Sequence, residues 1–117
     1  MAASLDAVES RVFTVRDFAL DLGGTLPECH LAYECHGKLN AAGDNAVLMT
    51  HGYTSSGHVA GRFAPGKAAP GVAEDQLGWW DPLVGPGKAI DTDRYFVVST
   101  NALGSAHGSS GPNSIDP

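Results

Sequence analysis

The uneven distribution of glycine and proline constrains this chain of 117 residues more than any other feature. After residue 51 the sequence holds 11 of its 15 glycines and 6 of its 7 prolines. Proline removes a backbone donor and glycine carries a high conformational entropy, so both interrupt helices. The second half of the chain therefore favours irregular loops over long helices. We expect at most one short helix there, around residues 56–63.

Four segments are typical of β-strands. Residues 12–20 and 26–36 are rich in β-branched and aromatic residues, and the short link between them contains Gly23 and Gly24, so we expect an antiparallel pair. Residues 46–50 and 95–100 are compact apolar runs typical of buried strands. More than 40 residues separate these two runs, enough for the crossover that a parallel pair requires.

Length and composition indicate one domain with a modest core. Hydrophobic residues make up 43% of the chain and charged residues 17%, which is typical of a folded protein. We interpret residues 1–10 as a loose leader and residues 11–117 as part of one α/β domain, with an antiparallel strand pair followed by parallel strands. Few helical segments are available to cover the two faces of a parallel sheet, so the domain is expected to be incomplete.

The charge balance narrows the classes of partner. A net charge of −6 argues against nucleic acid or an anionic membrane as the main partner. No apolar run approaches the ~20 residues of a membrane-spanning helix. The first ten residues lack the basic start of a secretory signal. We therefore expect a cytoplasmic protein.

The two cysteines lie in one predicted strand, and each is followed by a histidine. Cys29 precedes His30, and Cys35 precedes His36. Six residues of strand span about 20 Å, too far for the two sulfurs to share a metal ion or form a disulfide. We expect two buried thiols on one face of the strand and no metal site.

A candidate site follows the strand at residues 46–50, where the sequence continues His51-Gly52-Tyr53-Thr54. Ligands of open α/β sheets gather at the carboxyl ends of such strands. A glycine allows a sharp turn, and the N–H of Tyr53 would then point into the site as one half of an oxyanion hole. Taken alone, the tetrapeptide favours the alternative, an ordinary turn with a structural histidine.

Longer motifs in the chain favour the oxyanion-hole interpretation over the ordinary turn. They are GWWDPLVGPGKAIDTDRYFVVSTN, GSSGPNSIDP, LAYECHGKLN, DNAVLMTHGYTSSGH and VAGR. Together they closely resemble the homoserine O-acetyltransferase family, acyltransferases with the α/β-hydrolase fold. The resemblance covers residues 31–117 and extends more loosely back to residue 13. It implies that the chain is the N-terminal part of such an enzyme, with no bound cofactor.

The resemblance also implies an activity. In this family a serine takes an acyl group from acyl-CoA, the co-substrate, and passes it to the hydroxyl of homoserine in methionine biosynthesis. It assigns the backbone N–H of Tyr53 to the oxyanion hole. It assigns the loop of Gly52, Tyr53, Thr54 and Ser55 to substrate binding. For the full-length enzyme it leaves a homodimer open.

The resemblance places the nucleophile beyond this sequence, because the family's serine elbow follows the strand after GSSGPNSIDP, and its catalytic aspartate and histidine come later. The segment at residues 104–108 has glycines at both ends but alanine at its centre, so it offers no substitute. We expect the isolated chain to be inactive. Departures at Tyr53, at residues 105–107 and at Asp116 leave both the acyl group and the acceptor open. The alternatives are an esterase of the same fold and a non-catalytic gene remnant.

Overall fold

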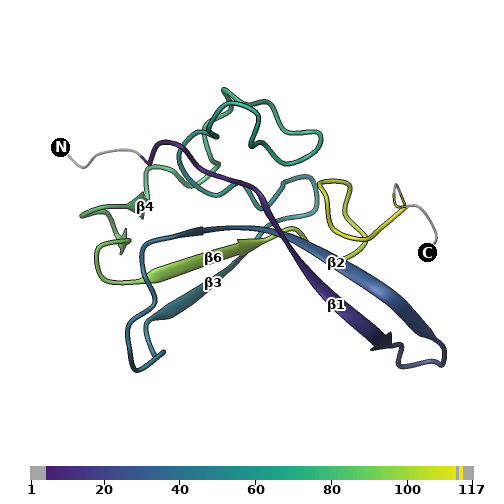
Figure 1. Ribbon diagram of the computed structural model, residues 1–117. Coiled ribbons are helices and arrows are strands. Elements are labelled where there is room, and N and C mark those ends of the chain that lie inside the picture. The colour runs from purple at the N-terminus through teal and green to yellow at the C-terminus, as the bar shows by residue number, and fades with distance from the viewer. Residues whose placement is uncertain (1–4, 113, 115–117) are drawn as a thin grey trace.

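The computed structural model describes residues 5–112 and 114, and within them it contains strands and loops but no helix (Figure 1). The strands are β1 (Arg11–Ala19), β2 (Thr25–His36), β3 (Ala46–Thr50), β4 (Val84–Gly85), β5 (Ile90–Asp91) and β6 (Phe96–Thr100). Four of them form one sheet in the order β1-β2-β6-β3, and β4 pairs with β5 separately. The four predicted strands are thus confirmed, whereas the two-residue strands β4 and β5 were not foreseen.

The first two strands form the predicted antiparallel pair. Their register runs from Arg11 opposite Tyr33 to Ala19 opposite Thr25. The turn is closed by the N–H of Leu20, which donates to the Gly24 carbonyl at 3.0 Å. Gly24 has a φ of 88°, in the left-handed region that favours glycine.

Strand β6 lies between β2 and β3 and joins the two halves of the sheet. It runs parallel to β3 and antiparallel to β2, so the predicted parallel pair is confirmed. Its residues Val97 and Ser99 are fully buried. Strand β3 is an edge strand of the described sheet, and the prediction that it is buried holds only for Met49, because Leu48 remains 65% exposed.

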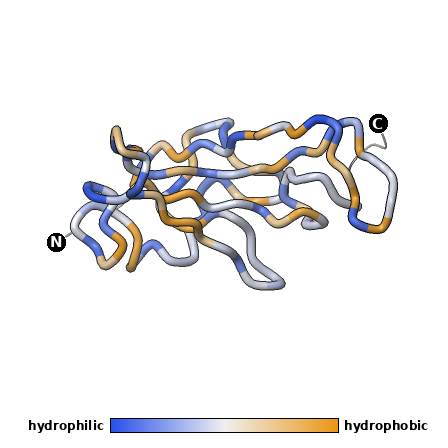
Figure 2. Tube along the Cα trace, turned by 90° about the horizontal axis from the view of Figure 1, so that it is seen from below, coloured by the Kyte–Doolittle hydropathy of each residue, from blue (hydrophilic) through white to orange (hydrophobic). Residues whose placement is uncertain are grey.

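The core lies between one face of this sheet and the loops that follow β3. Its larger cluster consists of Met49, Val59, Ala60, Val84 and Val97, and a smaller one of Val8, Phe63 and Ala69. Figure 2 shows hydrophobic stretches in the central strands and again at the end of the trace that carries the β1–β2 turn. At that turn Leu22 is fully exposed. The core is therefore modest, as the length predicts.

The helix predicted around residues 56–63 is wrong. This segment is an irregular chain that passes through the core, and its backbone donors find partners outside it. The N–H of Val59 donates to the Glu34 carboxylate at 2.7 Å, and the N–H of Gly61 donates to Asp81 at 2.8 Å. Because buried carboxylates satisfy these donors, no helical turn is needed to do so.

The prediction of a loose leader is wrong for residues 5–10. Val8 is buried, and its N–H donates to the Arg62 carbonyl at 3.0 Å. The Ala64 N–H donates in turn to the Val8 carbonyl at 2.9 Å. Residues 1–4 lie outside the described part of the chain, and a domain boundary at residue 10 stays a prediction.

The buried face of β2 changes along the strand. Cys29 is buried as expected, but Cys35 is only partly buried, and the fully covered side chains nearby are Glu34 and His36. The second half of β2 pairs with β6, and the loop after β3 contacts its Glu34 side chain. Both cysteines are free thiols. The prediction of two buried thiols is therefore correct for one of them.

Candidate functional site

The site predicted from the sequence begins where β3 ends, at His51. The Nε2 atom of His51 accepts a hydrogen bond from the Ala102 N–H at 3.0 Å. Its Nδ1 atom lies 2.7 Å from the Gly52 carbonyl, to which it donates. One ring nitrogen accepts and the other donates, as in a neutral imidazole. His51 therefore joins the ends of the parallel strands β3 and β6.

The loop after His51 makes a tight turn. The N–H of Ser55 donates to the Gly52 carbonyl at 3.1 Å. The side chain of Tyr53 is fully exposed, with a relative accessibility of 103%. Among the described residues, no acceptor forms a hydrogen bond with the Tyr53 N–H. Within the described residues, the N–H that follows the carboxyl end of β3 thus has no protein acceptor.

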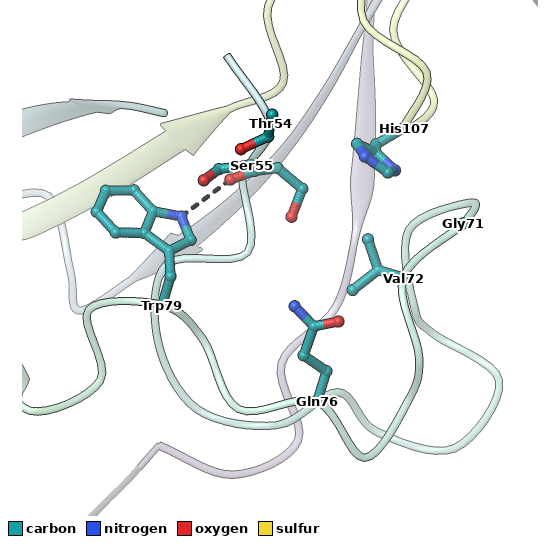
Figure 3. Close-up of a pocket in the computed structure, with 8 residues that line it drawn as sticks. Thr54, Ser55, Gly71, Val72, Gln76, Trp79 and His107 are labelled. Carbon is teal, nitrogen blue, oxygen red and sulfur yellow. Dashed lines mark hydrogen bonds between the residues drawn. The ribbon is translucent and has the colours of Figure 1, made fainter. Parts of the chain in front are cut away.

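A pocket of about 270 Å³ lies next to this turn (Figure 3). Its lining residues come from four loop segments and are Thr54, Ser55, Ser56, Gly71, Val72, Gln76, Trp79 and His107. The structure thus brings Thr54 and Ser55, two of the predicted substrate-binding residues, into one pocket. The other two, Gly52 and Tyr53, precede them in the turn and do not line it. Sequence reasoning missed the contributions of Gln76 and Trp79, which depend on how distant loops fold back.

Hydrogen bonds fix the walls of this pocket. The indole Nε1 of Trp79 donates to the Ser56 carbonyl at 2.9 Å (Figure 3). On the opposite side the Nδ1 atom of His107 donates to the Pro70 carbonyl at 2.9 Å. The His107 ring packs so closely on Gly71 that a Cβ there would lie 3.2 Å from Nδ1. Both walls are therefore anchored through side chains that reach across loops.

The loop after β6 is tied to β2 by the backbone of Asn101 and by the buried side chain of Ser109. Asn101 donates its N–H to the Ala32 carbonyl at 2.9 Å and accepts from the Gly57 N–H at 2.7 Å. The Ser109 hydroxyl donates to the Asn101 carbonyl at 2.6 Å and accepts from the Ala32 N–H at 2.9 Å. These bonds hold the loop that carries His107 in a fixed position relative to the loop that carries Thr54 and Ser55.

Beneath the pocket lies a buried cluster of Glu34, His36 and His58. The Glu34 carboxylate accepts from His36 Nε2 at 3.1 Å and from His58 Nδ1 at 2.9 Å. Burial raises the pKa of the Glu34 carboxyl, but the hydrogen bonds and charges of the two histidines outweigh it, so this pKa lies below its usual value. Burial lowers the pKa of His58, but the hydrogen bond and charge of Glu34, together with backbone hydrogen bonds, more than offset this, so that pKa is raised.

Three further kinds of functional feature were sought in the described part of the chain: an activated serine, a metal site and a membrane-spanning helix. No described serine hydroxyl lies within hydrogen-bonding distance of a histidine ring, as an activated nucleophile would require. Within residues 5–112 and 114, no group of three or more potential metal ligands is placed to hold an ion. The same residues contain no helix long and apolar enough to cross a membrane.

Comparison with known sequences gives a consistent set of relatives, although no family model matches the chain. The chain is 51% identical over 98 residues to homoserine O-acetyltransferase of Moorella thermoacetica, covering 84% of this chain and 24% of that protein. It is 42% identical to homoserine O-acetyltransferase of Carboxydothermus hydrogenoformans, covering 100% of this chain and 29% of that protein. It is 47% identical to homoserine O-succinyltransferase of Dechloromonas aromatica, covering 81% of this chain and 24% of that protein.

Solved structures agree with these relatives. The homoserine O-acetyltransferase of Bacillus anthracis matches with a TM-score of 0.80 and 32% identity, over 97% of this chain and 30% of that one. Esterase E22 matches with a TM-score of 0.72 and 36% identity, over 94% of this chain and 30% of that one. These neighbours have the α/β-hydrolase fold, so the predicted fold class is confirmed. The chain spans 24–30% of the length of these relatives.

Proposed function

Because the chain belongs to the homoserine O-acetyltransferase family, we propose that it is the N-terminal part of an acyltransferase that transfers an acyl group from acyl-CoA to a hydroxyl of homoserine or a similar hydroxy amino acid. The identity to three acyltransferases over most of the chain carries this proposal. Relatives named for acetyl and for succinyl transfer are similarly close, so the acyl group remains open. The proposed setting is methionine biosynthesis in the cytoplasm.

The geometry supports a role in the oxyanion hole. In acyl transfer the carbonyl oxygen gains negative charge in the transition state, and a fixed N–H donor stabilises that charge. The Tyr53 N–H lies at the carboxyl end of β3 and has no acceptor among the described residues. The acyl group then lies against the turn of Gly52, Thr54 and Ser55, beside the pocket.

We expect residues 1–117 to be inactive on their own. The described part contains the proposed oxyanion donor but no serine paired with a base, so we expect no acyl-enzyme to form through a Ser–His pair in it. No cofactor is required by the proposed reaction, which uses acyl-CoA as a co-substrate. A homodimer of the full-length enzyme is compatible with this proposal.

A second candidate is an esterase, in which water replaces the amino acid acceptor. The 36% identity and TM-score of 0.72 to esterase E22 favour it. The two functions share the oxyanion hole and the acyl-enzyme, and they differ only in the second step.

The two candidates can be separated in the full-length protein. Homoserine-dependent release of free CoA from acetyl-CoA or succinyl-CoA would support the transferase. Hydrolysis of p-nitrophenyl esters that homoserine does not affect would favour the esterase. Residues 1–117 alone serve as the negative control. A serine-linked acyl adduct detected on them by intact mass spectrometry would contradict the proposal that these residues lack the nucleophile.

A further inference from the structure

The ring of His58 lies between two acceptors. Its Nδ1 atom is 2.9 Å from the Glu34 carboxylate, and its Nε2 atom is 2.8 Å from the Gln76 carbonyl. A neutral imidazole has one N–H and can donate to only one of them. The residue is 1% exposed, so solvent water does not mediate either contact. With Glu34 ionised, both hydrogen bonds form together only when the ring is doubly protonated and positively charged.

The surroundings of the ring favour this charge. The Glu34 side chain is 3% exposed and is surrounded by donors, which include His36 Nε2 at 3.1 Å and the Val59 N–H at 2.7 Å. A carboxylate with several donors remains ionised in the interior. The aromatic ring of Phe63 stacks on His58 with a centroid separation of 4.0 Å and an interplanar angle of 22°, and an aromatic face attracts a cation. The titratable side chains that face the ring among the described residues are Glu34 and His36, both on β2.

His58 also connects three residues that line the pocket. Its ring holds the carbonyl of Gln76, its backbone N–H donates to the Ser56 hydroxyl at 3.2 Å, and its carbonyl accepts from the Trp79 N–H at 3.1 Å. Ser56, Gln76 and Trp79 all belong to the pocket wall. The ring of His58 therefore joins Glu34 on β2 to Gln76, while the backbone of the same residue bonds Ser56 and Trp79.

We propose that His58 is a positioning residue, held as an imidazolium by Glu34, which fixes the Ser56 and Gln76 sides of the candidate acyl pocket relative to each other. The inference deepens the proposed function, because the site that it positions is the proposed acyl site. Its geometric part, a charged His58 between Glu34 and Gln76, is independent of the reaction that the pocket carries out.

The first test measures the charge directly. Histidine side chains labelled with ¹⁵N in the full-length protein are followed by NMR from pH 6 to pH 9. We expect both His58 ring nitrogens to keep the shifts of an imidazolium at pH 8, above the ordinary histidine pKa of about 6.5. A neutral His58 ring at pH 7 would overturn the proposal.

Two complementary variants test the positioning. His58→Asn places an amide donor near the position of Nδ1 and so keeps the bond to Glu34, whereas His58→Gln places its amide near Nε2 and keeps the bond to Gln76. Neither variant carries a charge. His30→Gln is the matched control, because that ring lies on β2 outside the pocket.

We expect His58→Asn to increase amide hydrogen exchange at residues 76–79 by about tenfold, as for the loss of one charge-assisted bond, with a larger rise in KM for acyl-CoA than fall in kcat. His58→Gln should retain more protection at Gln76. Exchange in both variants equal to that of His30→Gln would contradict the positioning role. If the wild-type protein transferred no acyl group, the proposed function would fail, and the NMR and exchange results would still decide the role of His58.

Discussion

The side-chain oxygen of Asn101 accepts a hydrogen bond from the N–H of Gly57 at 2.7 Å in the interior of the protein. This bond connects the end of β6 to the loop that follows β3, and so holds together the two segments that meet at the candidate site. A Cβ at Gly57 would lie 2.9 Å from the Thr100 carbonyl carbon, so the two backbones approach as closely as a glycine permits. The contact explains why two loops can form a fixed pocket without a helix to support them.

Replacing this acceptor should destabilise the protein. In Asn101→Ala the buried Gly57 N–H loses its partner, which costs about 1–3 kcal/mol of unfolding free energy. Asn101→Asp keeps an acceptor oxygen and should retain more of the Gly57 bond. Urea denaturation of both variants measures the difference, with His30→Gln as a control of similar polarity at a half-exposed position. Equal stability of Asn101→Ala and the control would show that the Gly57 N–H finds another partner.

The close packing of Gly78 gives a second prediction. A Cβ at this position would lie 2.1 Å from the Ala60 backbone nitrogen, where only a backbone shift could make room. We expect Gly78→Ala to lower the unfolding free energy by about 3 kcal/mol, at the upper end for overpacking. Gly52→Ala is the matched control, because no atom lies within 4 Å of a Cβ there. Similar melting temperatures for the two variants would contradict this packing.

The stability should depend on pH through Glu34 and His58. The Glu34 pKa is depressed, so its contribution is complete above its usual value of 4.5 and is lost as the pH falls through the folded-state pKa. The His58 pKa is raised, so its contribution is complete below its usual value of 6.5 and is lost as the pH rises through the folded-state pKa. The pair therefore contributes most between pH 4.5 and 6.5.

Glu34→Gln provides the comparison for this pH dependence. The variant removes the carboxylate, so the difference in unfolding free energy between wild type and variant should be largest in that window and shrink on both sides. Chemical denaturation at intervals of one pH unit from 3 to 9 measures it. A difference that stays constant across the range would show that the pair does not titrate with folding.

The sequence predicted the strands well because their signal is local. The apolar run at residues 46–50 matches β3 to the residue, and the predicted parallel and antiparallel pairs all formed. Residues 56–63 were misread because their backbone donors pair with Glu34 and Asp81, 20 or more residues away along the chain. A hydrogen bond between residues so far apart leaves no periodic pattern in the sequence from which it could be predicted.

The candidate site was foreseen only in part for the same reason. Thr54 and Ser55 follow a strand, so their place at its carboxyl end was predictable, and both line the pocket. Gln76 and His107 enter the same pocket from loops without a regular pattern. The buried pair of Glu34 and His58 was also missed, because it becomes visible only when β2 and the loop after β3 pack together.

The role assigned to the Tyr53 amide can be tested by removing its hydrogen. Proline has no backbone N–H, so Tyr53→Pro eliminates the proposed donor, whereas Tyr53→Phe retains it and removes only the hydroxyl of an exposed side chain. In the full-length enzyme we expect Tyr53→Pro to lower kcat by about 10²–10³-fold, the usual effect of losing one oxyanion donor. Tyr53→Phe should stay close to wild type. Equal losses in both variants, at unchanged melting temperature, would assign the effect to the side chain.

The exposed edge of the sheet provides the last prediction. In strand β3 the Leu48 side chain is 65% exposed, and this strand pairs on one side only in the described sheet. An exposed apolar edge strand promotes association between chains. We expect residues 1–117 to self-associate, and Leu48→Lys to reduce this, as measured by light scattering, while changing the unfolding free energy by less than about 0.5 kcal/mol. Val47→Lys on the same strand is the control, because Val47 packs against the core and its replacement should destabilise the protein. Unchanged scattering in Leu48→Lys would place the association elsewhere, with the exposed Leu22 of the β1–β2 turn as the next position to test.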